Sequence, residues 1–154
     1  MLDIEYVGEL LVRQIGGVSN KKDLLEEFYL QFDEDFPDES WFEDEFNVAL
    51  NLARSVISRE NQAILKTKGN FYSLFGVCLE YYRATGNLQF VNVLEVQNQL
   101  TALVVRAKNN DFDAAIPDIA TYSEVSTRST SDKSRRAERE RILYSIIKQA
   151  EKLP

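Results

Sequence analysis

Apolar residues recur along the chain at the three- and four-residue spacing of helix faces, and no segment sustains the alternation typical of a strand. The pattern predicts seven helical segments: 3–15, about 20–32, 39–59, 70–85, 88–108, 112–125 and 132–152. Short polar or glycine-containing connections separate them, and no internal repeat is present. The sequence therefore predicts an all-α, single-domain helical bundle of six or seven helices over residues 1–154.

Residues typical of helix ends support these boundaries. Gly16-Gly17 and Gly86 can end helices in a left-handed turn, because glycine adopts that conformation without steric cost. Asp3, Ser19 or Asn20, Asn70, and Ser131 or Asp132 stand where a short polar side chain can cap a helix start. Pro117 is tolerated in the short segment 112–125 only near a first turn or a break.

One predicted helix is apolar nearly all round, and we expect it at the centre of the bundle. Its residues Phe71, Leu74, Phe75, Cys78, Leu79 and Tyr82 cover more than one face. Its rings could stack on nucleic-acid bases, but this periodicity favours a core helix. Single apolar faces are predicted on the other long helices: Ile4, Val7, Leu10, Leu11; Phe42, Phe46, Ala49, Leu50, Ala53, Val56, Ile57; Leu94, Leu100, Leu103, Val104, Ala107; Ile142, Leu143, Ile146, Ile147.

Composition removes several kinds of chemistry. The chain has no histidine and a single cysteine, Cys78, which excludes triads that need histidine, histidine or thiolate zinc sites, and a disulfide within the chain. Cys78 stands in an apolar run and is predicted to be a small core residue. We expect no catalytic residue, metal or cofactor. The N-terminal residues show no basic stretch followed by an apolar one, and no window reaches 18 consecutive apolar residues, so we expect no signal peptide, no membrane partner and a cytoplasmic protein.

The net charge of −7 is unevenly distributed along the sequence. Between Asp23 and Glu45 there are eleven acidic residues and no basic one. We interpret this stretch mainly as a solvated helix start, since acidic side chains favour the helix dipole. A metal site fits poorly because the spacing lacks the glycine and closing glutamate of a calcium loop. A patch that faces a partner is the remaining interpretation.

The Ser/Thr-rich segment 126–136 is the best candidate for a functional site. Hydroxyls and backbone N–H groups at a helix start can hold phosphate, and arginine adds bidentate charge. The predicted nucleic-acid-binding residues are Arg128, Lys133, Arg135, Arg136 and Arg139. The alternative is a capped, solvent-facing helix with the local pairs Arg135–Glu138 and Arg136–Glu140.

Three blocks of sequence carry a family resemblance. They are residues 3–37, residues 71–86 beginning Phe71-Tyr72-Ser73-Leu74-Phe75, and the Ser/Thr loop with the last helix, residues 126–147. In order and spacing they resemble the helical half that follows the ParB-like domain in GmrSD-type modification-dependent restriction proteins. The catalytic DGQQR-like turn and the histidine-dependent HNH domain of that family are absent.

The resemblance implies a non-catalytic accessory or scaffold region of a phage-defence protein. Such a region would be part of a longer protein and would pack on a ParB-like domain of the same or a partner chain, with DNA as a further expected partner. The alternative is a stand-alone protein–protein interaction or dimerisation module without a nucleic-acid role. Its acidic N-terminal third would meet a basic partner, or its apolar patches would form a homo-oligomer.

Overall fold

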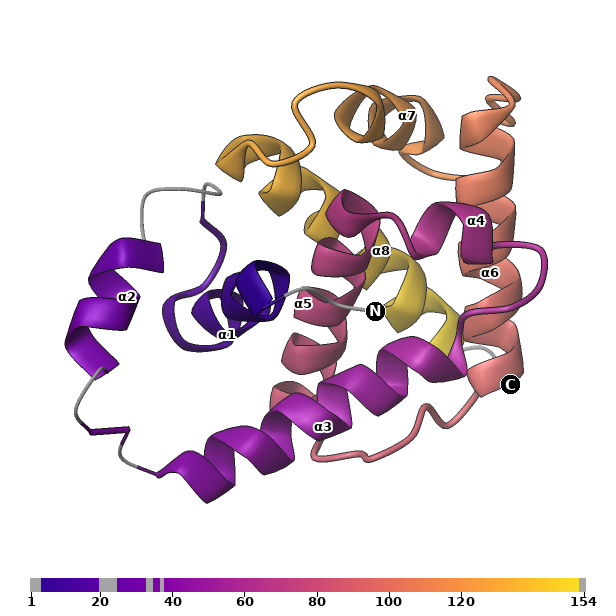
Figure 1. Cartoon of the computed structure of the whole chain (residues 1–154). Helices are drawn as coiled ribbons and strands as arrows, with labels where there is room; N and C mark the ends of the chain where they lie inside the picture. Colours follow the sequence, from indigo (N-terminus) through magenta and orange to yellow (C-terminus); the bar gives the residue numbers. More distant parts are fainter. Residues whose placement is uncertain (1–3, 20–24, 33–34, 37, 153–154) are drawn as a thin grey trace.

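The computed structural model describes residues 4–19, 25–32, 35–36 and 38–152, and it contains helices and no strands over them. The described residues form eight helices (Figure 1): α1 Ile4–Gly16, α2 Leu25–Phe32, α3 Glu39–Ser55, α4 Gln62–Leu65, α5 Lys68–Thr85, α6 Val93–Lys108, α7 Ile119–Thr127 and α8 Lys133–Lys152. The predicted all-α bundle is confirmed. The additional helix is α4, a single turn in a segment predicted to be a loop.

The helix α5 is the centre of the bundle, as its apolar pattern predicts. It packs against α1, α3, α4 and α8 (Figure 1), and every residue from Phe71 to Leu79 is buried. The rings of Phe46 and Phe75 lie 4.9 Å apart and join α3 to this core.

The helices α6 and α8 complete the core on the other side of α5. The predicted inward residues Leu100, Leu103, Val104, Ala107, Ile142, Leu143, Ile146 and Ile147 are all buried. Two predicted core positions are wrong: Ile4 is 87% exposed and Leu94 is 66% exposed. Each stands two residues before the first buried residue of its helix, Tyr6 or Val96, and therefore on the opposite side of the helix.

The helix ends predicted at Gly16-Gly17 and at Gly86 are confirmed. Gly17 (φ 80°) and Gly86 (φ 71°) both adopt the left-handed conformation directly after α1 and α5. The Gly86 N–H donates to the Tyr82 carbonyl oxygen at 2.7 Å, which satisfies a carbonyl at the end of α5. At the start of α8, Asp132 Oδ1 accepts hydrogen bonds from the backbone N–H groups of Ser134 and Arg135.

Several other predicted boundaries are wrong. The helix α5 begins at Lys68, before Asn70, because Thr67 is the extended residue at its start. The helix α7 begins only at Ile119, after Pro117 and a left-handed Asp118 (φ 60°). The helix α6 begins at Val93. The caps predicted at Asp3 and Asn20 lie outside the described residues.

Candidate functional site

Two buried ion pairs join the first and last helices across α5. The Arg13 guanidinium donates from Nε and Nη2 to the two Glu140 carboxylate oxygens at 2.9 and 2.7 Å. Arg136 Nη2 donates to Glu9 Oε2 at 2.7 Å. All four side chains are buried. Glu9 and Arg13 stand four residues apart on α1, and Arg136 and Glu140 stand four residues apart on α8. Each acidic residue therefore meets a basic residue of the other helix.

A row of small residues on α5 makes room for these charges. Gly69, Ser73 and Gly76 are spaced so that they share one face of the helix. A Cβ added at Gly76 would lie 2.3 Å from Glu140 Oε1 and 2.8 Å from Arg13 Nε. The small residues in the sequence block that carries the family resemblance therefore accommodate buried guanidinium and carboxylate groups.

Burial acts on the pKa values of these groups. Burial raises the pKa of Glu140, while the hydrogen bonds and charge of Arg13 act against that shift. Burial lowers the pKa of Arg13, but the hydrogen bonds and charge of Glu140 outweigh burial and raise it above its ordinary value. The bidentate geometry is that of a charged pair, because it gives each carboxylate oxygen its own N–H donor.

Two of the five predicted nucleic-acid-binding residues lie in the interior. Arg139 is fully buried and donates to Ser73 Oγ and to the carbonyl oxygens of Val125 and Thr130. The Arg136 guanidinium lies 3.8 Å from the centroid of the Tyr72 ring, in addition to its pair with Glu9. These contacts enclose both side chains, and a DNA backbone on the surface would not reach them.

The other three predicted residues lie closer to the surface. Arg128 and Lys133 are exposed, and Arg135 is half-buried with Nη1 donating to the Glu124 carbonyl oxygen at 2.8 Å. The predicted local pairs of α8 are wrong. Glu138 pairs with Arg141, three residues further along the same helix, at 2.7 Å. Glu140 pairs with the distant Arg13, also at 2.7 Å.

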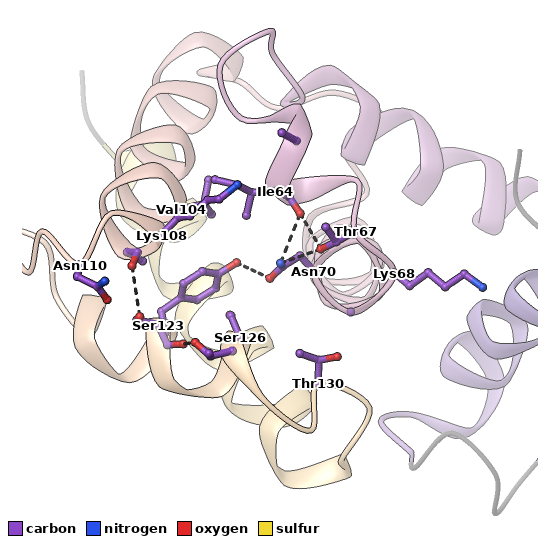
Figure 2. Close-up of a pocket in the computed structure, with 15 residues that line it drawn as sticks. Ile64, Thr67, Lys68, Asn70, Val104, Lys108, Asn110, Ser123, Ser126 and Thr130 are labelled. Atoms are coloured by element: carbon purple, nitrogen blue, oxygen red, sulfur yellow. Dashed lines mark hydrogen bonds between the residues drawn. The ribbon is translucent and has the colours of Figure 1, made fainter.

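The Ser/Thr loop forms one wall of a polar cavity of about 580 Å³ (Figure 2), between α4 and the start of α5 on one side and α6 and α7 on the other. Ser126, Thr127 and Thr130 line it. Tyr122 Oη donates to Asn70 Oδ1 at 2.8 Å, and Asn70 Nδ2 donates to Thr67 Oγ1 at 3.0 Å.

Most of the hydroxyl protons around this cavity already have acceptors. Thr67, Ser123 and Thr127 donate to the backbone carbonyl oxygens of Ile64, Ala107 and Ser123, respectively. The side chain of Lys68 points away from the cavity in Figure 2 and lies over the Tyr6 ring. These three hydroxyls therefore have no proton left for a phosphate. The cavity joins α7 to α5 through the hydrogen bond between Tyr122 and Asn70.

A second hollow, of about 510 Å³, lies between α1, α2 and α3 and is mainly aromatic. We call it the aromatic groove. Its lining residues are Val7, Leu11, Phe28, Tyr29, Phe32, Phe36, Glu39, Phe42, Glu43 and Phe46. The rings of Phe28, Phe32, Phe36 and Phe42 contact one another in a row, with 4.8 to 5.3 Å between the centroids of successive rings.

The outer wall of the aromatic groove is thin. The helix α2 lies at the left edge of Figure 1, beyond α1, and has no buried residue. Leu30 on α2 is 82% exposed, and Trp41 on α3 is 56% exposed with its ring against Phe42. This end of the molecule thus presents large apolar side chains that its own fold leaves without cover.

The surface around the aromatic groove is acidic. Among the described residues between Ile4 and Asn47, every exposed charged side chain is a carboxylate: Glu5, Glu26, Glu27, Asp35, Asp38, Glu39, Glu43 and Asp44. Among the described residues of this range the basic side chain is that of Arg13, which is buried in its pair with Glu140. The sequence indicates the acidity, while the groove itself depends on how α2 and α3 fold against α1.

Other kinds of site receive no structural support in the described part of the chain. There, no three His, Cys, Asp or Glu side chains gather where they could hold a metal ion. Cys78 is fully buried, and burial raises the pKa of its thiol far above the ordinary value. None of the described helices combines the length and apolarity needed to cross a membrane.

Comparison with known proteins adds no relative. No family model, curated protein or solved structure matches the chain. The resemblance to GmrSD-type proteins therefore stays a prediction, and the geometry of the molecule carries the functional argument.

Proposed function

We propose that this chain is a protein-interaction module, and that its aromatic groove holds an apolar helix of a partner protein. The observation that carries the proposal is the uncovered aromatic surface between α1, α2 and α3. Exposed apolar side chains next to a hollow of this size are typical of partner-binding surfaces. A helix fits because three helices already form the walls, and a helix that enters such a trough completes the packing.

The partner is a different protein and not a second copy of this chain. Two copies that met through this surface would bring their acidic side chains together, and facing like charges cost several kcal/mol. A ParB-like domain of the same or a partner protein, as the resemblance implies, is one source of such a helix. An accessory role in a restriction protein and an interaction role are therefore compatible.

Contact with a DNA backbone is a second candidate, favoured by the surface positions of Arg128, Lys133 and Arg135. Its test is a salt titration of plain and modified duplexes with the chain and with the variant Arg128→Glu/Lys133→Glu. Weaker binding and a flatter salt dependence in the variant support the contact. Equal binding by the two proteins overturns it.

The main proposal is tested with a helical peptide of about 14 residues, roughly four turns, that carries leucines on one face and glutamines on the other. The only tryptophan of the chain, Trp41, stands beside the groove and reports occupancy through its fluorescence. We expect a saturable blue shift with this peptide. A peptide of the same composition with scattered leucines should give none.

Matched variants locate the binding site. Phe36→Ala and Tyr29→Ala remove groove side chains, whereas Leu94→Gln removes an exposed apolar side chain on α6, away from the groove. We expect about tenfold weaker binding for the first two variants and unchanged binding for the third. No shift with either peptide, or equal losses in all three variants, would overturn the proposal.

A further inference from the structure

The charges around the aromatic groove, in addition to its shape, indicate which kind of partner helix can bind there. Glu39 and Glu43 line the groove itself and stand four residues apart on α3. Both are exposed, and neither forms a salt bridge with a described lysine or arginine. Two adjacent carboxylates on one helix face repel each other weakly, and a cation placed between them relieves that repulsion.

The buried carboxylate of the same helix behaves differently. Glu45 is buried and accepts from Arg83 Nε at 2.7 Å and from Gln14 Nε2 at 2.8 Å. These contacts fix α3 to α1 and α5 and hold two walls of the groove in place. The carboxylates of α3 are thus of two kinds: one is paired within the fold, and those at the groove face outward.

We infer that the partner helix is basic and amphipathic, with its apolar face on the groove and lysine or arginine side chains flanking it. This inference rests on the proposed function, because it describes the occupant of the same groove. Its basis is charge complementarity: the exposed charged side chains around the groove are all acidic over the described residues from Ile4 to Asn47.

The other charged elements of the molecule do not disturb this pattern. Arg13 on α1 and Arg83 on α5 have their guanidinium groups on Glu45, Glu80 and Glu140. The exposed Arg54 stands in the last turn of α3, at the opposite end of that helix from Glu39 and Glu43. The surface cations Arg128 and Lys133 belong to the start of α8 and the loop before it, which do not line the groove. The described side chains around the groove therefore present a negative field to an approaching helix.

The test compares three peptides with the same leucine face and a polar face of lysine, glutamine or glutamate, followed by Trp41 fluorescence. We expect the lysine peptide to bind about tenfold more tightly than the glutamine peptide at about 50 mM salt. That advantage should shrink at about 500 mM salt, where charges are screened over a few ångströms. The glutamate peptide should bind most weakly.

Charge-neutralising variants assign the effect to the groove. Glu39→Gln/Glu43→Gln should reduce the advantage of the lysine peptide over the glutamine peptide about threefold to tenfold. The matched control Glu60→Gln/Glu124→Gln makes the same change in net charge beyond the far end of α3 and on α7. It should keep the advantage nearly intact.

The outcomes separate this inference from the proposed function. Equal binding of the lysine and glutamine peptides would overturn the basic partner and leave the interaction module standing. An advantage that the control variant abolishes as fully as the groove variant would also overturn it, because net charge alone would then explain the effect. Absence of binding by all three peptides would overturn both proposals.

Discussion

Arg13 and Glu140, separated by 127 positions in the sequence, form a buried bidentate ion pair across the central helix of the bundle. The pair stands beside a second one, between Glu9 and Arg136. Taking such charges out of water costs several kcal/mol each, which only good geometry and further hydrogen bonds can offset. The first and last described helices are thus joined by specific polar contacts in addition to apolar packing.

Loss of one partner should therefore be costly. We expect Arg13→Met to lower the free energy of unfolding by about 3–5 kcal/mol, because it leaves Glu140 charged and buried without its donor. Urea denaturation followed by circular dichroism measures the change.

The double variant Arg13→Met/Glu140→Leu is the matched control for this prediction. With both charges removed, apolar side chains fill the same space, and we expect most of the lost stability to return. Additive losses in the double variant would contradict this account, because they would show that the two residues contribute independently.

Gly76 should not tolerate even a methyl group. A Cβ at this position meets Glu140 Oε1 at 2.3 Å, so Gly76→Ala should push the ion pair off α5 and cost about 1–3 kcal/mol. Gly16→Ala changes an exposed glycine in the last turn of α1 and should stabilise by up to about 1 kcal/mol through helix propensity. Thermal melts of both variants test the expected opposite signs.

Local periodicity was sufficient to predict the bundle, because burial of one face repeats every three or four residues along each helix. It identified α5 as the core helix and the buried faces of α6 and α8. It failed at short elements such as α4, where one turn between polar residues has no periodicity to detect. It also failed near the starts of helices, where Ile4 and Leu94 are predicted to face the core but are exposed.

The burial of Arg136 and Arg139 could not be predicted from their own helix. Charged residues are seldom buried, so a basic segment is first interpreted as a solvated or ligand-binding face. Their side-chain partners, Glu9 on α1 and Ser73 on α5, stand far away in the sequence, and a local pair of Arg136 with Glu140 is an equally good prediction. A usable signal was present in the row Gly69, Ser73 and Gly76, which leaves space on an otherwise bulky helix.

The predicted nucleic-acid-binding arginines should fall into two classes by the effect of their substitution on stability. Arg136→Glu would place a carboxylate against buried Glu9, and we expect a loss of about 3–5 kcal/mol or failure to fold. Arg128→Glu changes an exposed side chain before the helix and should alter stability by less than about 0.5 kcal/mol. Chemical denaturation of both variants provides the comparison, and a fully stable Arg136→Glu protein would contradict the buried pair.

Alkaline conditions should destabilise the bundle through Tyr122. Burial raises the pKa of Tyr122 to about 12 from its ordinary value of 10.0. Its contribution to stability is complete below pH 10, where both folded and unfolded chains keep the proton. Between pH 10 and 12 the unfolded chain loses the proton first, so the free energy of unfolding falls as pH rises, by about 2–3 kcal/mol in total.

The variant Tyr122→Phe separates this effect from the hydrogen bond that the hydroxyl makes. At neutral pH it should cost about 1–3 kcal/mol, because Asn70 Oδ1 loses its buried donor. Above pH 10 its stability should fall less steeply than that of the unmodified chain, since one buried phenol no longer titrates.

Tyr6 and Tyr81, whose pKa values burial also raises, should maintain the remaining slope. Urea titrations at intervals between pH 8 and 12 measure both quantities, and parallel pH profiles for the two proteins would show that Tyr122 ionises as freely in the fold as out of it.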